Sequence, residues 1–419
     1  MFLKQLKLQN VRCFESLEID FDLEGGNNRK WTVILGENGT GKSTVLRSAA
    51  LLLAGSDALL DLLDNPADWV RHDASEAVIS GVIETQEGEA REISLVIGRK
   101  EPASVIVSRS IETLGPLNAA LANTERSYFV AAYGGLRRLN SGGLTGKTAG
   151  FRNQRAQNVA TLFSRDAELN PIESWAMTLD YNLGDEGIST VAEVLSDFLG
   201  EVSFSRIDKK NRTLLFNTPD GELPLQQLSD GYQNIAAWVG DLLFRITETF
   251  GDYKNPLNAR GLLIIDEVAV HLHPKWQRRL LTFLNKKFPK MQLVVTTHSA
   301  SVAQQADEGS LFYIARDEGG VNIHPFEGDP GRLLVNQLLM TEAFGNSSDE
   351  SLEVETLKDQ YRTLYRKESK DDSDAQEMKK ISDQIGQRPI EHYQVSAFTI
   401  EQRALLDKIS KVRIEEDEQ

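Results

Sequence analysis

Hydrophobic positions along this chain alternate with polar ones near the N-terminus and form longer apolar runs further on. The alternation over residues 1–21 predicts one or two strands, and the apolar run 31–35, which ends at Gly36, predicts another. Residues 262–265 and 293–295 are apolar throughout, as is typical of strands buried on both faces of a parallel sheet. We therefore expect an α/β fold.

Helical spacing is clearest in the second half of the chain. Apolar residues three and four positions apart predict a long amphipathic helix over 229–250 and two late helices over 351–366 and 375–385. We also expect helices over 41–54 and over 172–199, the latter with a break near Gly184–Gly187. Further strands are predicted at 77–84, 93–97, 104–107, 128–133, 204–207 and 213–217.

Length and composition limit the class of protein. A chain of 419 residues exceeds the ~250–300 residues over which one hydrophobic core grows, so we expect more than one lobe. No apolar run approaches the ~18 residues that a membrane helix needs. The single cysteine, Cys13, has no partner for an internal disulfide. We expect a cytoplasmic protein that is not bound to a membrane.

The formal net charge of −16 argues against broad, non-specific nucleic-acid binding. Residues 134–165 are the exception, because they are rich in glycine and carry six basic and no acidic side chains. The glycines predict a mobile loop. Its charges favour two interpretations equally, contact with nucleic acid or contact with an acidic protein surface. The six basic residues are Arg137, Arg138, Lys147, Arg152, Arg155 and Arg165.

The strongest chemical motif is GENGTGKS at residues 36–43, which fits the phosphate-loop pattern G-x-x-x-x-G-K-[ST]. A predicted strand precedes it and a predicted helix follows, so backbone N–H groups and the helix N-terminus would face phosphate oxygens. Lys42 is expected to reach the β- and γ-phosphates, and Ser43 to bind Mg²⁺. The alternative is a glycine-rich turn that only caps a helix. The expected nucleotide contacts here are Gly36, Glu37, Asn38, Gly39, Thr40, Gly41, Lys42, Ser43 and Thr44.

Three further segments, all C-terminal to the phosphate loop, carry candidate functional residues. LLIIDE at 262–267 is an apolar strand ending in two acids, of which Asp266 would hold Mg²⁺ and Glu267 would polarise the attacking water. LSDGYQ at 228–233 places Ser229 at a helix N-cap, which is a potential anion site. VVTTHS at 294–299 ends a buried strand with His298.

These four motifs together resemble an ABC-type ATPase head within the P-loop NTPases. The resemblance implies that Ser229, Asp230 and Gly231 correspond to the L-S-G-G-Q signature, with Asp230 in place of its first glycine. It also implies that His298 is the switch histidine that senses the γ-phosphate. In such heads the signature acts in trans, so a homodimer or a higher homo-oligomer is expected, with ATP and Mg²⁺ as the bound groups.

Other segments are similar to a narrower group. LKLQNVRCFESLEIDF at 6–21 resembles the opening strands of RecF, SMC and OLD-family heads, where the residue matching Arg12 lies near the nucleotide. DEVAVHLHPKWQ at 266–277 resembles OLD/RecF-like ATPases, including the ATPase subunits of the anti-phage systems Septu, PARIS and some retrons. In this alignment Leu272 and His273 fall at the D-loop, and Tyr133 stands near the Q-loop position. A metal site at His271 and His273 is not favoured, because no further ligands surround them.

The resemblance implies a mixed-sheet lobe, a parallel-sheet core and a helical lobe, and the two late helices predict a C-terminal helical hairpin. The predicted divisions are an N-terminal ATPase lobe at 1–133, a basic loop with a helical and β insertion at 134–225, a C-terminal ATPase lobe at 226–345, a helical hairpin at 346–395 and a helix with an acidic tail at 396–419.

The expected function is an ATPase switch. ATP closes a dimer of heads, hydrolysis opens it, and closure gates a separate effector protein, a nuclease or toxin, or a nucleic acid, in anti-phage defence. A RecF-like role in DNA repair is the alternative. A transporter subunit fits less well, because HLHPKWQ at 271–277 is not typical of that class. An intact Glu267 argues against a module that binds ATP without hydrolysing it.

Overall fold

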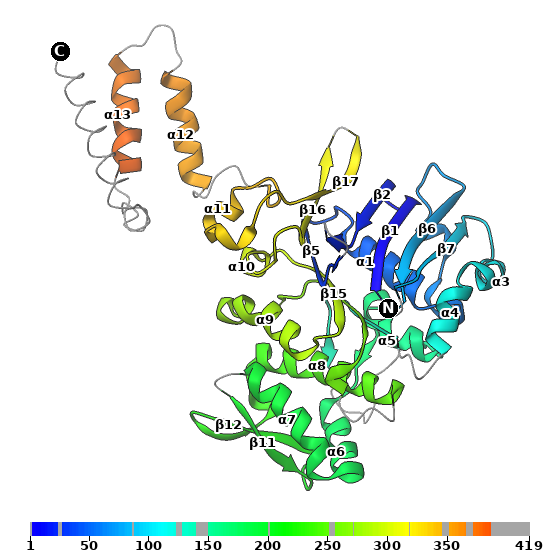
Figure 1. Cartoon of the computed structure of the whole chain (residues 1–419). Coiled ribbons are helices and arrows are strands. Elements are labelled where there is room, and N and C mark those ends of the chain that lie inside the picture. Colours follow the sequence, from blue (N-terminus) through cyan, green and yellow to red (C-terminus); the bar gives the residue numbers. More distant parts are fainter. Residues whose placement is uncertain are drawn as a thin grey trace. The chain divides into compact units, whose positions relative to one another are not determined.

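The computed structural model describes residues 2–23, 27–85, 88–122, 128–139, 150–199, 202–250, 256–270, 272–317, 319–345, 352–365 and 372–386. The chain divides into two compact units, Met1–Ser347 and Ser348–Gln419 (Figure 1). All four motifs lie in the first unit.

A six-stranded sheet forms the centre of the first unit. Its order is β17-β16-β5-β15-β14-β8, parallel except for the edge strand β17. A separate cluster of buried hydrophobic side chains covers each face of the sheet. Successive residues of β5 point to opposite faces, so Val33 packs in one cluster and Ile34 in the other. Because parallel strands end at the same edge of the sheet, the segments that follow β5, β8, β14 and β15 meet there. The bounds are β5 (Trp31–Gly36), β8 (Phe129–Tyr133), β14 (Gly261–Ile265), β15 (Met291–Thr296), β16 (Leu311–Asp317) and β17 (Gly320–Pro325).

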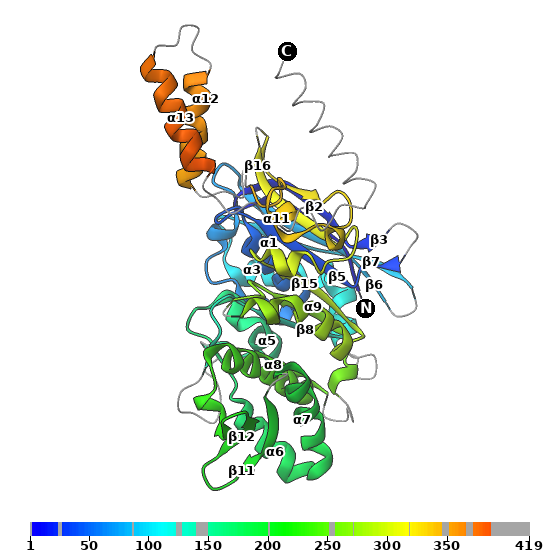
Figure 2. The same cartoon turned by 90° about the vertical axis from the view of Figure 1, so that its left-hand side faces the viewer.

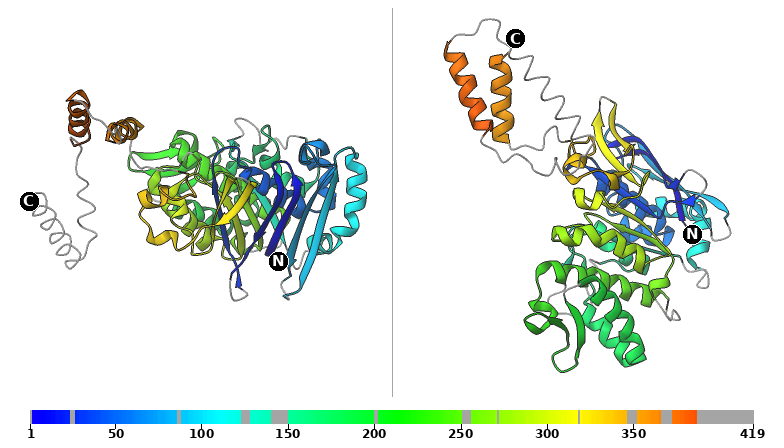
Figure 3. Two further views of the ribbon diagram at one scale, coloured as in Figure 1. Left: turned by 90° about the horizontal axis from the view of Figure 1, so that it is seen from above. Right: turned by 60° about the vertical axis from the view of Figure 1, so that its left-hand side comes forward.

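A four-stranded antiparallel sheet lies beside the centre, in the order β2-β1-β6-β7 (Figure 3, left). Helix α1 (Lys42–Leu53) packs against strands of both sheets. Gln292 of β15 joins them further: its side chain accepts a hydrogen bond from the N–H of Leu3 and donates one to the carbonyl of Leu3, both at 2.8 Å. The strand bounds are β1 (Phe2–Val11), β2 (Phe14–Asp20), β6 (Glu76–Glu84) and β7 (Ala90–Gly98).

Two sequence predictions in this region are wrong. Residues 104–107, predicted as a strand, belong to helix α3 (Ala103–Thr113), because Ile106 and Ser110, one turn apart, are both buried. Part of the predicted basic loop is helix α5 (Gln154–Phe163), whose first turn is capped by the side chain of Asn153. The glycine-rich residues 140–149 lie outside the described residues.

Helices α6, α7 and α8 gather with strands β11, β12 and β13 at one end of the first unit (Figure 2). The predicted break is confirmed at Gly184, which has a φ of 57°. The bounds are α6 (Ile172–Leu183), α7 (Asp185–Leu199), β11 (Ser203–Asp208), β12 (Thr213–Thr218), β13 (Gly221–Pro224) and α8 (Asp230–Thr249).

The remaining elements of the first unit are β3 (Asp22–Leu23), β4 (Asn27–Asn28), α2 (Leu59–Leu62), α4 (Gly115–Ala122), β9 (Arg138–Leu139), β10 (Glu168–Leu169), α9 (Pro274–Lys287), α10 (Ala300–Ala303) and α11 (Val335–Leu339). The second unit contains α12 (Leu352–Tyr365) and α13 (Asp372–Gly386). The predicted hairpin and the five-part division of the chain stay predictions. Within the described ranges, no helix combines the length and the hydrophobicity needed to cross a membrane.

A buried polar network fixes α8 against the central sheet. Asp241 of α8, with no exposed surface, accepts hydrogen bonds from the hydroxyl of Tyr133 at 3.0 Å and the Nε of Arg245 at 2.5 Å. It also accepts two from Asn170, from the backbone N–H at 2.8 Å and from Nδ2 at 2.7 Å. This carboxylate therefore ties α8 to β8 and to the segment after β10.

Replacing Asp241 with alanine is expected to destabilise the protein by about 3–5 kcal/mol, because the buried guanidinium of Arg245 loses its carboxylate. Asp241→Asn keeps an acceptor oxygen and the volume, so its loss should be smaller. The midpoints of urea unfolding at constant slope measure both. An alanine variant as stable as the wild type would show that the network does not stabilise the fold.

Candidate nucleotide-binding site

The loop between β5 and α1 has the strand–loop–helix form that its motif predicts. Gly36 and Gly41 adopt φ values of 149° and 101°, which L-residues rarely adopt. A Cβ at Gly36 would lie 2.7 Å from the carbonyl oxygen of Ile314, and one at Gly41 would lie 2.6 Å from the ring of Phe14. Packing around the loop therefore requires glycine at both positions. Within the loop Glu37, Asn38 and Gly39 are exposed, and Thr40 and Thr44 are buried.

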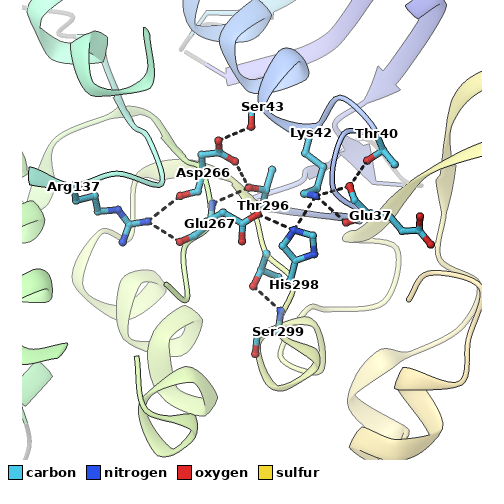
Figure 4. Close-up of polar contacts among 12 residues, drawn as sticks. Glu37, Thr40, Lys42, Ser43, Arg137, Asp266, Glu267, Thr296, His298 and Ser299 are labelled. Atoms are coloured by element: carbon cyan, nitrogen blue, oxygen red, sulfur yellow. Dashed lines mark hydrogen bonds and ion pairs between the residues drawn. The ribbon is translucent and has the colours of Figure 1, made fainter. Parts of the chain in front are cut away.

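Lys42 is the buried cation of this loop. Its Nζ donates hydrogen bonds to the carbonyls of Gly36 at 2.8 Å and Glu37 at 3.0 Å, and lies 3.1 Å from Nε2 of His298 (Figure 4). Burial lowers the pKa of Lys42, and the nearby Glu267 carboxylate opposes that shift. The ammonium thus lies inside the curve of the loop, where an anionic group would meet both a charge and backbone N–H groups.

Two hydroxyls hold the carboxylate of Asp266 at the end of β14. Ser43 donates to its Oδ2 at 2.6 Å, and Thr296, the last residue of β15, donates to its Oδ1 at 2.5 Å. Hydroxyl and carboxylate oxygens are the ligands that Mg²⁺ prefers, so this pair of groups fits that ion. Sequence reasoning did not identify Thr296, although it lies inside the segment that carries His298.

Glu267 has an unusual backbone and a close histidine. Its φ is 49°, in a region that residues other than glycine rarely adopt, and its N–H donates to Oγ1 of Thr296 at 2.8 Å. Its Oε1 lies 3.1 Å from Nε2 of His298. Burial raises the pKa of Glu267, and His298 and Lys42 oppose that shift. The structure therefore brings Lys42, Ser43, Asp266, Glu267 and His298 together.

Arg137 does not lie where the sequence suggested. As one of the six basic residues it is predicted to contact nucleic acid or an acidic protein surface, but it is only 7% exposed. Its Nη2 donates to the carbonyls of Asp266 at 3.0 Å and Glu267 at 2.9 Å, and burial lowers its pKa to about 10. The prediction for Arg137 is wrong because its guanidinium is turned into the protein.

The other basic residues of that stretch are placed differently. Arg152 is exposed, and Arg155 lies 3.7 Å from a carboxylate oxygen of Asp57. The side chain of Arg138 and the whole of Lys147 lie outside the described residues. A contact of these residues with nucleic acid stays a prediction.

Tyr133 does not point toward the P-loop. Its hydroxyl donates to Asp241, and its ring centre lies 5.9 Å from that of Trp238 on α8. Gly135 lies beside Glu267 instead, because a Cβ at Gly135 would lie 3.6 Å from Cγ of Glu267. Tyr133 thus supports α8, and its correspondence to the Q-loop position stays a prediction.

Arg12 lies in the turn between β1 and β2 with a φ of 51°. Its guanidinium lies 4.7 Å from the ring centre of Trp69, and burial together with Arg47 lowers its pKa. The next residue, Cys13, packs on the P-loop, because a Cβ at Gly41 would lie 2.7 Å from its Sγ. The turn therefore lies against the loop, and a nucleotide contact by Arg12 stays a prediction.

Ser229 lies at the exposed N-terminus of α8 and lines a hollow of about 440 Å³. Among the described residues, none of the P-loop lines this hollow. His273 caps α9, its Nδ1 accepting from the N–H of Lys275 at 3.2 Å, and the described residues hold no group of three or more possible metal ligands of the His, Cys, Asp and Glu types. His271 and the side chain of Asp230 lie outside the described residues. The lining residues are Ser229, Gly231, Tyr232, Leu272, His273, Lys275 and Trp276.

Comparison with known families places these features in a wider group. The family model described as "AAA domain, putative AbiEii toxin, Type IV TA system" matches residues 31–303. That range begins with the strand before the P-loop and ends after His298. The match therefore covers all four motifs.

Three known proteins are similar to different shares of this chain. The Septu protein PtuA of Bacillus mycoides (strain KBAB4) is 26% identical over 392 residues, which cover 92% of this chain and 50% of that protein. The "Retron Ec83 probable ATPase" of Escherichia coli is 31% identical over 134 residues, 32% of this chain and 25% of that protein. The DNA replication and repair protein RecF of Geobacter metallireducens is 29% identical over 142 residues, 33% and 36% of the two chains.

This chain thus spans about half the length of the PtuA protein and smaller shares of the other two. Among solved structures, the SMC head domain from Thermotoga maritima has a TM-score of 0.41 and 16% identity, covering 78% of this chain and 100% of that one. The resemblance to Septu, retron and RecF ATPases that the motifs indicated is confirmed by the sequence matches.

Proposed function

The chain belongs to the family of AAA domains whose model it matches over residues 31–303, and on this premise we propose that it is an ATP-hydrolysing switch. The observation that carries the proposal is the convergence of five side chains at the carboxyl edge of the central sheet. Lys42 and Ser43 come from the P-loop helix, Asp266 and Glu267 follow β14, and His298 follows β15.

Binding of ATP is assigned to the P-loop. The backbone N–H groups of 36–43 and the N-terminus of α1 surround the phosphates, and Lys42 leaves its loop carbonyls to neutralise the terminal phosphates. Ser43 and Asp266 would hold Mg²⁺, which supplies charge neutralisation between the β- and γ-phosphates. Thr296 keeps the Asp266 carboxylate oriented through its hydroxyl.

Hydrolysis is assigned to Glu267 and His298. The Glu267 carboxylate accepts a hydrogen bond from the water that attacks the γ-phosphorus, the bond from that phosphorus to the ADP oxygen breaks, and the water proton moves toward the carboxylate. His298 would sense whether a γ-phosphate is present, and its distance of 3.1 Å from both Lys42 and Glu267 supports this role.

The signature at Ser229 is assigned to contact the nucleotide that a second copy of the chain binds. Ser229 is exposed at a helix N-terminus, in a hollow that no described P-loop residue lines. Such a surface can receive the phosphates bound by a facing subunit. ATP would then join two chains, and hydrolysis would separate them.

The biological use is proposed from the named relatives. The Septu and retron names support a role in anti-phage defence, in which closure of the dimer gates a separate effector protein. The RecF match supports a second candidate, an ATPase that acts on DNA in repair. Stimulation of hydrolysis by double-stranded DNA, without any co-purifying effector, would favour the second.

The proposal is tested by phosphate release and light scattering on the purified chain. With MgATP we expect the mass to double, and specific activity to rise with protein concentration because each site needs two chains. Hydrolysis by a species that stays monomeric at every concentration would refute the composite site. A dimer that does not hydrolyse ATP would refute the proposed ATPase activity.

A further inference from the structure

Arg137 touches two segments: the turn at Asp266 and Glu267, called the catalytic turn below, and α8, called the signature helix because it follows Ser229. Its Nη2 donates to the carbonyls of Asp266 and Glu267, at 3.0 and 2.9 Å. Its guanidinium carbon lies 5.7 Å from the ring centre of Trp238 on α8, close enough for a cation–π contact. Helix α8 begins immediately after Ser229. One buried side chain therefore connects the two parts of the proposed mechanism.

Arg137 bonds to the backbone of Glu267, which is in a strained conformation. Glu267 keeps its φ of 49° with its N–H bonded to Thr296 and its carbonyl bonded to Arg137 (Figure 4). A backbone in this region persists only when its surroundings fix it from several sides. Loss of the Arg137 bond would therefore let the turn, and with it the Glu267 carboxylate, move away from its position.

Fold stability alone explains this residue poorly. The hydrogen-bond acceptors found for the guanidinium in the described structure are all carbonyls, the third being that of Gly134 at 3.3 Å from Nε. Taking a cation out of water is costly when no carboxylate bonds it directly, and burial indeed lowers its pKa to about 10. A hydrophobic side chain of similar volume would fill the same space without that cost.

We propose that Arg137 is a positioning residue, which transmits engagement of the signature helix α8 to the Glu267 carboxylate. The inference rests on the proposed function, because it needs both the composite site and hydrolysis through Glu267. When the facing nucleotide engages the N-terminus of α8, a shift of the helix changes the position of Trp238 against the guanidinium. Arg137 then holds the catalytic turn, and with it the Glu267 carboxylate, in the position that hydrolysis needs. Turnover therefore occurs after the dimer has closed.

The first test compares Arg137→Met, which keeps volume and removes the charge, with Arg137→Lys, which keeps the charge and one donor group. The matched control is Arg332→Met, because the Arg332 side chain is 84% exposed. For Arg137→Met we expect unchanged MgATP affinity, measured with a fluorescent nucleotide. ATP-dependent pairing, measured by light scattering, should be at least as strong as in the wild type, because slower hydrolysis delays opening of the dimer. Turnover in the dimer should fall at least tenfold. Arg137→Lys should recover part of that loss, and Arg332→Met should match the wild type.

The second test asks whether Arg137 acts through Glu267. Single-turnover hydrolysis is measured for Arg137→Met, for Glu267→Gln and for the double variant. If Arg137 acts only by positioning Glu267, adding its substitution to Glu267→Gln should cost less than about twofold more. Losses that multiply would overturn the proposal. Trp238→Phe, which weakens the contact from the α8 side, should lower turnover and leave pairing intact.

The outcomes separate this inference from the function on which it rests. Wild-type hydrolysis by Glu267→Gln would refute the proposed mechanism. An inactive Glu267→Gln beside a fully active Arg137→Met would refute the positioning role alone. If Arg137→Met does not fold, as judged by its thermal unfolding, Arg137→Lys decides: turnover equal to wild type, with Trp238→Phe also fully active, would overturn the proposal.

Discussion

Replacing Lys42 with alanine is expected to abolish nucleotide binding and hydrolysis and to leave the fold intact. The Lys42 ammonium lies at the centre of the loop, among the carbonyls of Gly36 and Glu37 and beside His298. Alanine removes the positive charge that would neutralise the terminal phosphates, and no other side chain of the loop supplies one. Nucleotide titration and phosphate release measure the loss.

Thermal unfolding tests the second half of this prediction. Burial lowers the pKa of Lys42, which means that the fold disfavours its charged form, so removing that charge should not lower the midpoint of unfolding. Lys209→Ala is the matched control, because that side chain is 73% exposed. An alanine variant at Lys42 that still hydrolyses ATP at the wild-type rate would refute the assignment of the loop.

Glu267→Gln is expected to lower hydrolysis by about 10²–10⁴, which corresponds to roughly 3–5.5 kcal/mol of barrier. Glutamine keeps the shape and one acceptor oxygen but removes the charge that orients and activates the water. Binding should survive, because Lys42, Ser43 and Asp266 are unchanged. The ATP-closed dimer should therefore accumulate, since hydrolysis is its route to opening.

Ser229→Arg should have the opposite effect on pairing. A long, bulky side chain at the exposed start of α8 would block the facing nucleotide, while the P-loop of the same chain would still bind ATP. Light scattering of both variants, with and without MgATP, shows the contrast. Normal hydrolysis by Glu267→Gln, or wild-type pairing by Ser229→Arg, would mean that the composite-site mechanism is wrong.

The strands that position the site could be predicted because burial on both faces leaves apolar runs without interruption, as in 262–265 and 293–295. Their parallel order then explains why Lys42, Asp266 and His298 meet. Helix α3 could not be predicted, because the β-branched residues at 105–107 also fit a strand. Only the burial of Ile106 together with Ser110 distinguishes the two.

Arg137 shows a different limit of sequence reasoning. Its neighbours in the chain are glycine and basic residues, which are typical of an exposed loop. Its partners, by contrast, are the carbonyls of Asp266 and Glu267, about 130 positions further along the chain. Composition reports the local segment and carries no information on such a distant contact. Thr296 was missed for the same reason, since its role depends on Asp266 in the neighbouring strand.

The order of the central sheet has a consequence for how the protein is made. Strand β5 is synthesised early, but its neighbours β15 and β16 begin only at residues 291 and 311. The hydrogen bonds between Gln292 and Leu3 likewise cannot form before β15 has been synthesised. At about 5–20 residues per second, that interval is roughly 10–50 seconds. Until it ends, the P-loop has neither Asp266 nor His298 in place. Nascent or truncated chains that stop short of β15 should therefore gain no stability from ATP, so stabilisation by nucleotide would show that synthesis has passed this strand.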